Sequence, residues 1–167
     1  ADALQELGPS FVKFGQSLST RADIVGEEIA TDLAELQDHL APFSFQEVKE
    51  TIESEFEQPL VDLFSDFDDV PVAAASIAQV HYAVTTEGFP VAVKILRPQI
   101  EEAFNKDLDL FYWLAELIER VQPLYKRLRP IEVIRTFNET VDLEMDLRLE
   151  AAAASELREN FEEDATC

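Results

Sequence analysis

The spacing of hydrophobic positions changes twice along the chain. In the first third, apolar residues recur every three or four positions, which is the period of an amphipathic helix. The positions that follow this period in the first two segments are Phe11, Phe14, Leu18, Ile29, Leu33, Leu36 and Leu40. We expect Ser10 to cap the first of these helices and Gly26 to open the second.

A third helix is predicted from Ser44 onwards. Ser44 and Glu47 fit the capping box, in which each side chain bonds to the backbone N–H of the other residue. The apolar face that follows comprises Phe45, Val48, Ile52 and Phe56.

In the middle of the chain the pattern becomes that of short strands. Residues 79–84 and 89–96 are rich in β-branched and aromatic residues, and a turn at 85–88 joins them. Residues 70–72 lead into this region and an Arg-Pro pair ends it. The predicted order is therefore strand, tight loop, strand, turn, strand.

Helical spacing returns after residue 98. Residues 99–122 carry apolar residues on more than one face, so we expect this helix to lie between two layers. Pro123 and Pro130 bracket a basic linker, and one long helix is expected from about Ile131 to Phe161.

Composition narrows the class of protein. The 167 residues suit one domain or part of one, and a hydrophobic content of 47% is ample for a packed core. A net charge of −22 argues against nucleic acid as a partner, and it leaves any polyanionic ligand dependent on local cations or metal. No apolar run approaches the roughly 20 residues of a membrane span. Because the chain starts without Met and ends at Cys167, we expect it to belong to a longer protein.

An alanine-rich loop precedes the first strong strand. A kinase nucleotide lobe carries G-x-G-x-x-G-x-V at this place; here Ala73, Ala75 and Ala78 take the glycine positions and Val80 takes the valine position. Since Cβ disfavours the positive φ that glycine permits, this loop should be stiff and should sit differently over phosphates. Alone, the segment is equally explained by small residues where a strand and a helix pack closely.

A lysine, Lys94, ends the next strand after a Val-Ala-Val run, as in the V-A-I-K strand of kinases. In kinases this lysine contacts the α- and β-phosphates and is held by a helix glutamate. The alternative is a lysine that extends to solvent from a strand end. The joint placement of Val80 and Lys94 favours a nucleotide site.

Two polar clusters lie on predicted helices. Lys13, Gly15 and Gln16 share the first, and a mid-helix glycine costs about 1 kcal/mol against alanine, so Gly15 indicates the close approach of another element. The second cluster comprises the carboxylates Glu144, Asp146 and Glu150. The alternative for both clusters is a solvated helix face in an acidic chain.

Taken in order, these motifs resemble the K-x-G-Q, A-A-A-S, V-A-x-K and E-x-D signatures of the UbiB (AarF-domain-containing) atypical kinase family. The resemblance covers nearly the whole chain. It implies an α+β fold that is mostly helical. A helical N-terminal extension would occupy residues 1–68. A partial protein-kinase-like small lobe with about three antiparallel strands would occupy residues 69–167, without the catalytic large lobe.

The resemblance also implies a site for ATP or ADP with Mg²⁺. The expected nucleotide-binding residues are Ala73, Ala74, Ala75, Ser76, Ala78, Val80, Lys94 and Glu150, with Glu150 as the partner of Lys94. Lys13, Gly15 and Gln16 would gate the site together with Glu144 and Asp146, and we expect Lys13 to pair with Glu144 or Asp146. No metal ligand is assigned.

The chain departs from a complete kinase. Neither His39 nor His81 begins an H-x-D motif, and Asp66-Phe67-Asp68 lacks the glycine of D-F-G and is expected to precede the first strand. We therefore expect no catalytic residue here and an inactive fragment.

The expected function is that of the ATP-binding part of an atypical kinase or ATPase-like protein that supports isoprenoid quinone biosynthesis or lipid homeostasis. The alternative is a non-catalytic module that binds a prenyl lipid or a partner protein and uses nucleotide as a conformational signal. The expected partners are nucleotide, prenyl lipid and quinone-biosynthesis proteins. We expect a cytoplasmic protein with peripheral membrane association through segments outside this chain.

Overall fold

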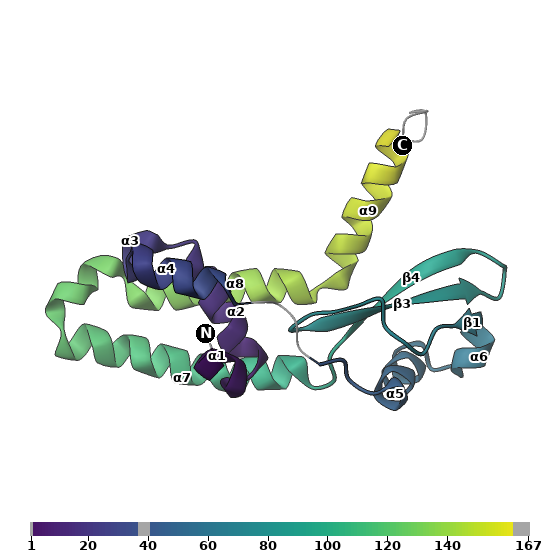
Figure 1. The fold of residues 1–167 in the computed structure, drawn as a ribbon, viewed down its shortest axis with the longest axis horizontal. Helices are drawn as coiled ribbons and strands as arrows, with labels where there is room; N and C mark the ends of the chain where they lie inside the picture. Colours follow the sequence, from purple (N-terminus) through teal and green to yellow (C-terminus); the bar gives the residue numbers. More distant parts are fainter. Residues whose placement is uncertain (1, 37–40, 162–167) are drawn as a thin grey trace. The chain divides into compact units, whose positions relative to one another are not determined.

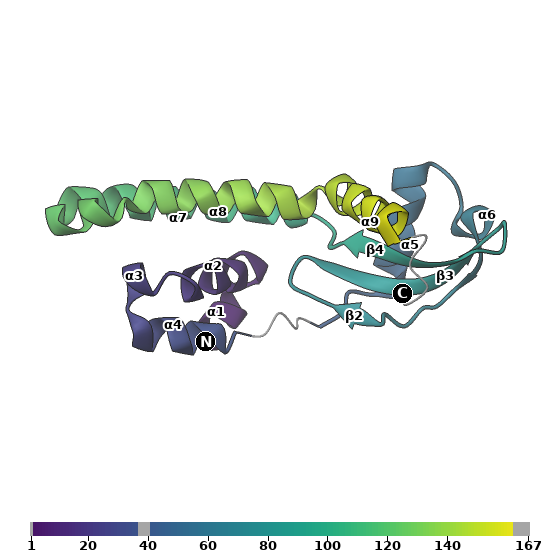
Figure 2. The same cartoon turned by 90° about the horizontal axis from the view of Figure 1, so that it is seen from above.

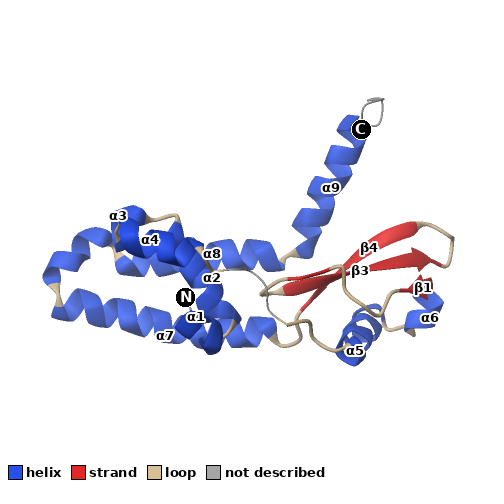
Figure 3. Ribbon diagram, in the orientation of Figure 1, coloured by secondary structure: helices blue, strands red, loops and turns tan. Residues whose placement is uncertain are grey.

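The computed structural model describes residues 2–36 and 41–161 (Figure 1). Contacts divide the chain into two compact units, Ala1–Asp107 and Leu108–Cys167. The helices are α1 (Asp2–Leu7), α2 (Pro9–Ser19), α3 (Ala22–Val25), α4 (Glu27–Ala34), α5 (Phe45–Phe56), α6 (Leu60–Leu63), α7 (Ile100–Val121), α8 (Pro130–Met145) and α9 (Leu147–Phe161), with a 3-10 helix η1 (Pro123–Leu128). The strands are β1 (Phe64–Phe67), β2 (Ala73–Ala74), β3 (Ala78–Thr85) and β4 (Pro90–Leu96). Helices thus predominate beside one small antiparallel sheet (Figure 3), which confirms the expected α+β class.

The first four helices pack around α2. Val12 on α2 is fully buried, and Ala30 and Leu33 on α4 are buried as well. Leu33 and Leu36 are buried as predicted, whereas Ile29 is 53% exposed and Ala30 takes its place in the buried stripe. Leu40, the last predicted member, lies outside the described residues.

The starts of these helices were predicted with mixed success. Helix α2 begins at Pro9 with Gly8 as its N-cap, because the fixed φ of proline suits the first helical turn. Ser10 is therefore a buried residue within the first turn, and its predicted capping role is wrong. The predicted opening of α4 at Gly26 is confirmed.

Strand β3 is the centre of the sheet. It pairs with β4 along one side, and along its other side with β2 near its start and with β1 near its end (Figure 2). The sheet is therefore three strands wide, with its first strand interrupted between β1 and β2, as expected for about three antiparallel strands. Asp66 and Phe67 lie inside β1, so the expectation that they precede the first strand is wrong.

Helix α5 covers one face of this sheet. Its predicted capping box is confirmed, since Ser44 Oγ accepts a hydrogen bond from the Glu47 N–H and a Glu47 carboxylate oxygen accepts one from the Ser44 N–H. The core between α5, α6 and β4 comprises Phe43, Val48, Ile52, Leu60 and Ile95. Phe67 packs beside it, with its ring 5.8 Å from that of Phe45. The apolar face of α5 ends before Phe56, which is exposed.

The second unit is a helical hairpin followed by α9. Helices α7 and α8 run antiparallel, and the rings of Phe111 and Phe137 lie 6.1 Å apart between them (Figure 1). We expected α7 to lie between two layers, but its residues Trp113 and Leu114 are exposed. The predicted linker is the 3-10 helix η1. The predicted single helix over 131–161 is wrong, because the chain breaks at Asp146 into α8 and α9.

The expected boundary at residue 68, between a helical extension and a partial small lobe, stays a prediction. In the structure, both α5 and β1 precede that residue and pack with the sheet.

Candidate functional site

Three of the predicted site residues form one row across the sheet. Ala73 on β2 is the register partner of Val80 on β3, and Val80 is in turn the partner of Lys94 on β4. Directly opposed residues of an antiparallel sheet direct their side chains to the same face. Ala73, Val80 and Lys94 therefore share one face of the sheet, although they come from three different strands.

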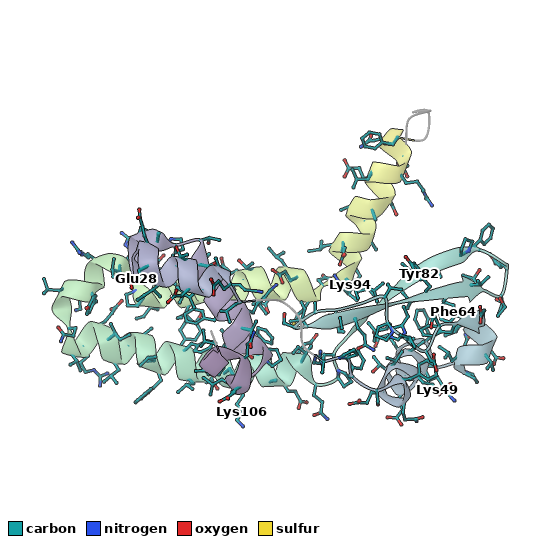
Figure 4. All side chains as sticks on the ribbon, in the orientation of Figure 1. Glu28, Lys49, Phe64, Tyr82, Lys94 and Lys106 are labelled. Carbon is teal, nitrogen blue, oxygen red and sulfur yellow. The ribbon has the colours of Figure 1, made fainter. Side chains whose placement is uncertain are left out.

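This row lies on the sheet face opposite to α5. Gln79, His81 and Ile95, which belong to the other face, are all buried, whereas Tyr82 on the face of the row is 61% exposed (Figure 4). We call the face with Ala73, Val80 and Lys94 the open face. It offers an apolar floor with one ammonium group at its edge.

Ala92 also belongs to the open face and was missed as a site residue. It lies two positions before Lys94 on β4, is exposed, and is the register partner of Tyr82. The signal was available in the sequence, because alternate residues of a strand share a face.

The alanine-rich segment is the tip of a tight hairpin between β2 and β3. The Ala75 N–H donates to the Ala78 carbonyl at 2.8 Å, and the Val72 N–H donates to the Val80 carbonyl at 2.8 Å. None of the described residues from Ala73 to Ala78 has a positive φ. Alanine therefore meets no steric penalty here, and the conformational freedom of a glycine-rich loop is not required.

Arg97 holds this hairpin from the end of β4. Its backbone N–H donates to the Ile77 carbonyl at 2.8 Å, and its guanidinium donates to the carbonyls of Ser76 and Ala75, each at 3.2 Å. The same guanidinium reaches the Ala41 carbonyl at 3.1 Å. The planar fork of arginine suits this task because it presents several donors at once.

The surroundings of Arg97 are partly apolar. Its guanidinium lies 5.3 Å from the centre of the Phe43 ring, in cation–π contact. Burial lowers the pKa of Arg97 from its ordinary value, while the charge of Glu47 raises it. This role of Arg97 has no local signature, since the carbonyls of Ala41, Ala75 and Ser76 lie far from it in the sequence.

A buried polar network fixes β3 against the loop before α5. The Gln79 side chain accepts a hydrogen bond from the Phe43 N–H at 3.0 Å and donates one to the Phe43 carbonyl at 3.3 Å. Its amide nitrogen also lies 2.9 Å from His81 Nε2, and His81 Nδ1 lies 2.7 Å from the Asp68 carbonyl. Because a carbonyl only accepts, Nδ1 carries the proton and Nε2 accepts from Gln79. This network positions β3, and therefore Val80, from behind.

A shallow hollow of about 410 Å³ lies further along the sheet. Its lining residues are Asp66, Asp68, Tyr82, Ala83, Val84, Pro90, Val91 and Ala92. Lys94 is not among them, and the two aspartates would repel a phosphate. The hollow is therefore distinct from the phosphate position expected at Lys94.

Gly15 and Gln16 have structural tasks within the first four helices. A Cβ atom on Gly15 would lie 2.5 Å from Leu36 Cδ1 and 3.0 Å from Leu4 Cδ1, so the predicted close approach of another element is confirmed. Gln16 Nε2 donates to the Leu36 carbonyl at 3.4 Å, just after the end of α4. Lys13 is half-buried on the same helix.

Asp146 has a local cationic partner that the sequence reading missed. The guanidinium of Arg148 donates to its two carboxylate oxygens at 2.7 and 2.8 Å. The hydrogen bond from Arg148 is the main reason that the pKa of Asp146 lies below its usual value. Glu144 ends up on α8 and Glu150 on α9, since the chain bends at Asp146. The expected pairs of Lys13 with Glu144 or Asp146, and of Lys94 with Glu150, join different units and stay predictions.

The model of the ABC1 atypical kinase-like domain matches residues 35–167. The chain belongs to this family. Among curated relatives, proteins described as "Probable protein kinase UbiB" from Marinobacter nauticus and Vibrio cholerae are each 47% identical over 96% of this chain. The resemblance to the UbiB family is thereby confirmed.

A solved structure supports the fold as well. The chain is similar to the Mycobacterium tuberculosis protein in "The complex structure of Rv3197-erythromycin", with 30% identity, a TM-score of 0.62 and 90% of this chain covered. The chain spans only 29 to 30% of the length of the two UbiB relatives and 38% of the solved chain.

The part of the chain that the structure describes contains neither a metal-ligand cluster nor a membrane-spanning helix. Among the described residues, no group of three or more His, Cys, Asp or Glu side chains lies together in a way that could hold a metal ion. Within the same residues, no helix combines the length and the apolar character needed to cross a bilayer.

Proposed function

We propose that this chain forms the nucleotide-binding part of an atypical kinase or ATPase-like protein. The row of Ala73, Val80 and Lys94 on the open face carries the proposal. Val80 and Ala92 would take the apolar face of the base, and the Lys94 ammonium would take phosphate oxygens. Bound ATP with Mg²⁺ would supply a transferable phosphoryl group, and the metal ligands would come from residues outside the chain.

The alanine hairpin would cover the phosphates as a rigid element. The hydrogen bonds from Arg97 to the carbonyls of Ala75 and Ser76 would keep the hairpin in place, so ligand binding would order the backbone only a little further. We further propose that Glu150 orients Lys94, and that Lys13, Gln16, Glu144 and Asp146 control access. To pair with Lys13, Asp146 would have to release Arg148 or bind both cations. Releasing Arg148 would cost little, because its ion pair with Asp146 is exposed.

The whole protein would support isoprenoid quinone biosynthesis or lipid homeostasis, with peripheral membrane association. This proposal rests on the UbiB resemblance and on the names of the curated relatives.

The test is nucleotide binding and hydrolysis by the full-length protein. Lys94→Ala should weaken ATP and ADP binding at least tenfold, because one charge-assisted contact contributes roughly 1.5–3 kcal/mol. Lys106→Ala, which removes a lysine from α7, is the matched control and should change neither property. Mg²⁺-dependent hydrolysis that vanishes in Lys94→Ala would support an enzyme. Equal nucleotide affinity in wild type and Lys94→Ala would refute the site.

The second candidate is a non-catalytic binding module for a prenyl lipid or a partner protein. The apolar hollow beside Tyr82 and Pro90, and a solved relative described in complex with erythromycin, both favour keeping it. Lipid binding that survives Lys94→Ala in a protein without hydrolysis would select this module.

A further inference from the structure

Basic residues gather at one end of the α7–α8 hairpin. Residues 120–131, which we call the basic tip, contain four basic residues and no acidic residue. The remaining 155 residues contain nine basic and 35 acidic residues. The tip is therefore the reverse of the rest of the chain in charge.

Large apolar side chains accompany these charges. Leu124 is 79% exposed, Val121 is 63% exposed and Tyr125 is 51% exposed. They lie on η1 and at the end of α7, where the hairpin reverses direction (Figure 1). Exposed apolar and basic side chains on one short segment are typical of a surface that lies in a membrane interface.

The cationic side chains of the tip are open to solvent. Lys126, Arg127 and Arg129 are all exposed. The nearest acidic residues are Glu119 and Glu132, and Glu132 already pairs with Arg135 at 2.7 Å. The local field at η1 is therefore positive in a strongly negative chain.

We propose that the basic tip binds the surface of an anionic lipid bilayer. Leu124 and Tyr125 would enter the headgroup region, and Lys126, Arg127 and Arg129 would contact lipid phosphates. The inference assigns a surface to the membrane association proposed above, and it places that surface inside this chain; it does not require nucleotide binding.

The geometry favours a bilayer over a nucleic acid. Helix α8 carries its residues up to about 24 Å from the tip, at about 1.5 Å per residue. With the hairpin axis along the bilayer normal, the acidic residues of α8 beyond its first turns would lie farther from the bilayer surface than the Debye length of about 8–10 Å. A nucleic acid would leave Leu124 and Val121 without an apolar environment, whereas a bilayer provides one.

The experiment is vesicle sedimentation of the full chain. Phosphatidylcholine vesicles with phosphatidylglycerol should bind it, and vesicles of phosphatidylcholine alone should bind much less. The triple variant Lys126→Gln, Arg127→Gln, Arg129→Gln should reduce the partition coefficient about 100-fold, since each cation near an anionic surface contributes about fivefold. Added KCl should weaken wild-type binding in the same direction.

A matched triple variant separates the tip from net charge. Lys49→Gln, Lys106→Gln and Arg158→Gln remove the same number of cations elsewhere, and binding should change little. Leu124→Ser with Tyr125→Ser should weaken binding while the charge is unchanged. Equal binding to both vesicle types, or an equal loss in the two triple variants, would overturn the proposal. So would an oligonucleotide bound through the tip when no vesicle is bound.

Discussion

Arg97 should determine the stability of the alanine hairpin. In Arg97→Ala, the carbonyls of Ala75, Ser76 and Ala41 lose their guanidinium donor, and the cation–π contact to Phe43 disappears. The three hydrogen bonds are long, at 3.1–3.2 Å, and the side chain is only partly buried, so about 0.5 kcal/mol each is a fitting value at the lower end of the usual range. With about 0.5 kcal/mol for the cation–π contact, the hairpin should lose about 2 kcal/mol.

Hydrogen exchange measures this loss locally. The Ala75 amide donates to the Ala78 carbonyl within the hairpin, so it reports opening of the turn. A loss of about 2 kcal/mol corresponds to an exchange rate about 30-fold faster. Amides in the middle of α5 are the internal reference and should keep their rates. Arg158→Ala, which removes an exposed arginine on α9, is the control substitution.

A conservative variant tests the mechanism. Arg97→Lys keeps the positive charge but lacks the planar fork, so it should recover less than half of the lost protection. Full recovery by lysine would show that charge alone matters. An Ala75 amide that exchanges within twofold of wild type in Arg97→Ala would refute the role of Arg97.

Three further predictions follow from contacts elsewhere. Gly15→Ala should lower the free energy of unfolding by about 1 kcal/mol, since overpacking of about 1–3 kcal/mol exceeds the gain in helix propensity. In a Leu36→Ala background, Gly15→Ala should cost less, as a double-mutant cycle in urea would show. Additive effects of the two substitutions would contradict the contact between Gly15 and Leu36. Gln79→Leu should destabilise the chain by about 2–4 kcal/mol because it leaves the N–H and carbonyl of Phe43 without their partner; a change below about 1 kcal/mol in urea unfolding would speak against the network. Hydrogen bonds with Ser44 hold the pKa of Glu47 low, so the Glu47 carboxylate stabilises α5 above its usual pKa, and this stabilisation is lost as the pH falls through the lowered value. Hydrogen exchange in the first turn of α5 should therefore accelerate on acidification in wild type. A pH profile that Glu47→Gln does not flatten would contradict this assignment.

Local patterns predicted the elements whose causes lie close together in the sequence. The capping box at Ser44 and the turn before β4 depend on residues within four positions, and both were read correctly. The single helix over 131–161 was a failure of the same method. Its helical spacing continues across Asp146, and only the local geometry of that residue, with Arg148 on its carboxylate, reveals the break.

The site was predictable where it follows strand alternation. The motif indicated that Val80 and Lys94 lie on consecutive strands, and the register of β3 and β4 pairs the two residues on one face. Ala92 and Arg148 were missed although their signals are local, whereas two other missed residues, Arg97 and Gln79, act across long separations. Arg97 joins carbonyls from residues 41, 75 and 76, and Gln79 reaches Phe43, so neither role has a signature in the adjacent sequence.

The alanine hairpin shows why the loss of three glycines need not be a defect. A glycine-rich loop is mobile and gains its order when its N–H groups meet phosphate. Here the backbone from Ala73 to Ala78 stays at negative φ, and three successive carbonyls are bonded by Arg97 before any ligand arrives. A loop that is already ordered has little freedom to adapt its backbone to a phosphate, so in the proposed site any discrimination between nucleotides would come from the row of Val80 and Lys94. Replacing the alanines by glycine should therefore loosen the hairpin less when Arg97 still donates to the carbonyls of Ala75, Ser76 and Ile77. The glycine substitutions and Arg97→Ala should accordingly be strongly coupled.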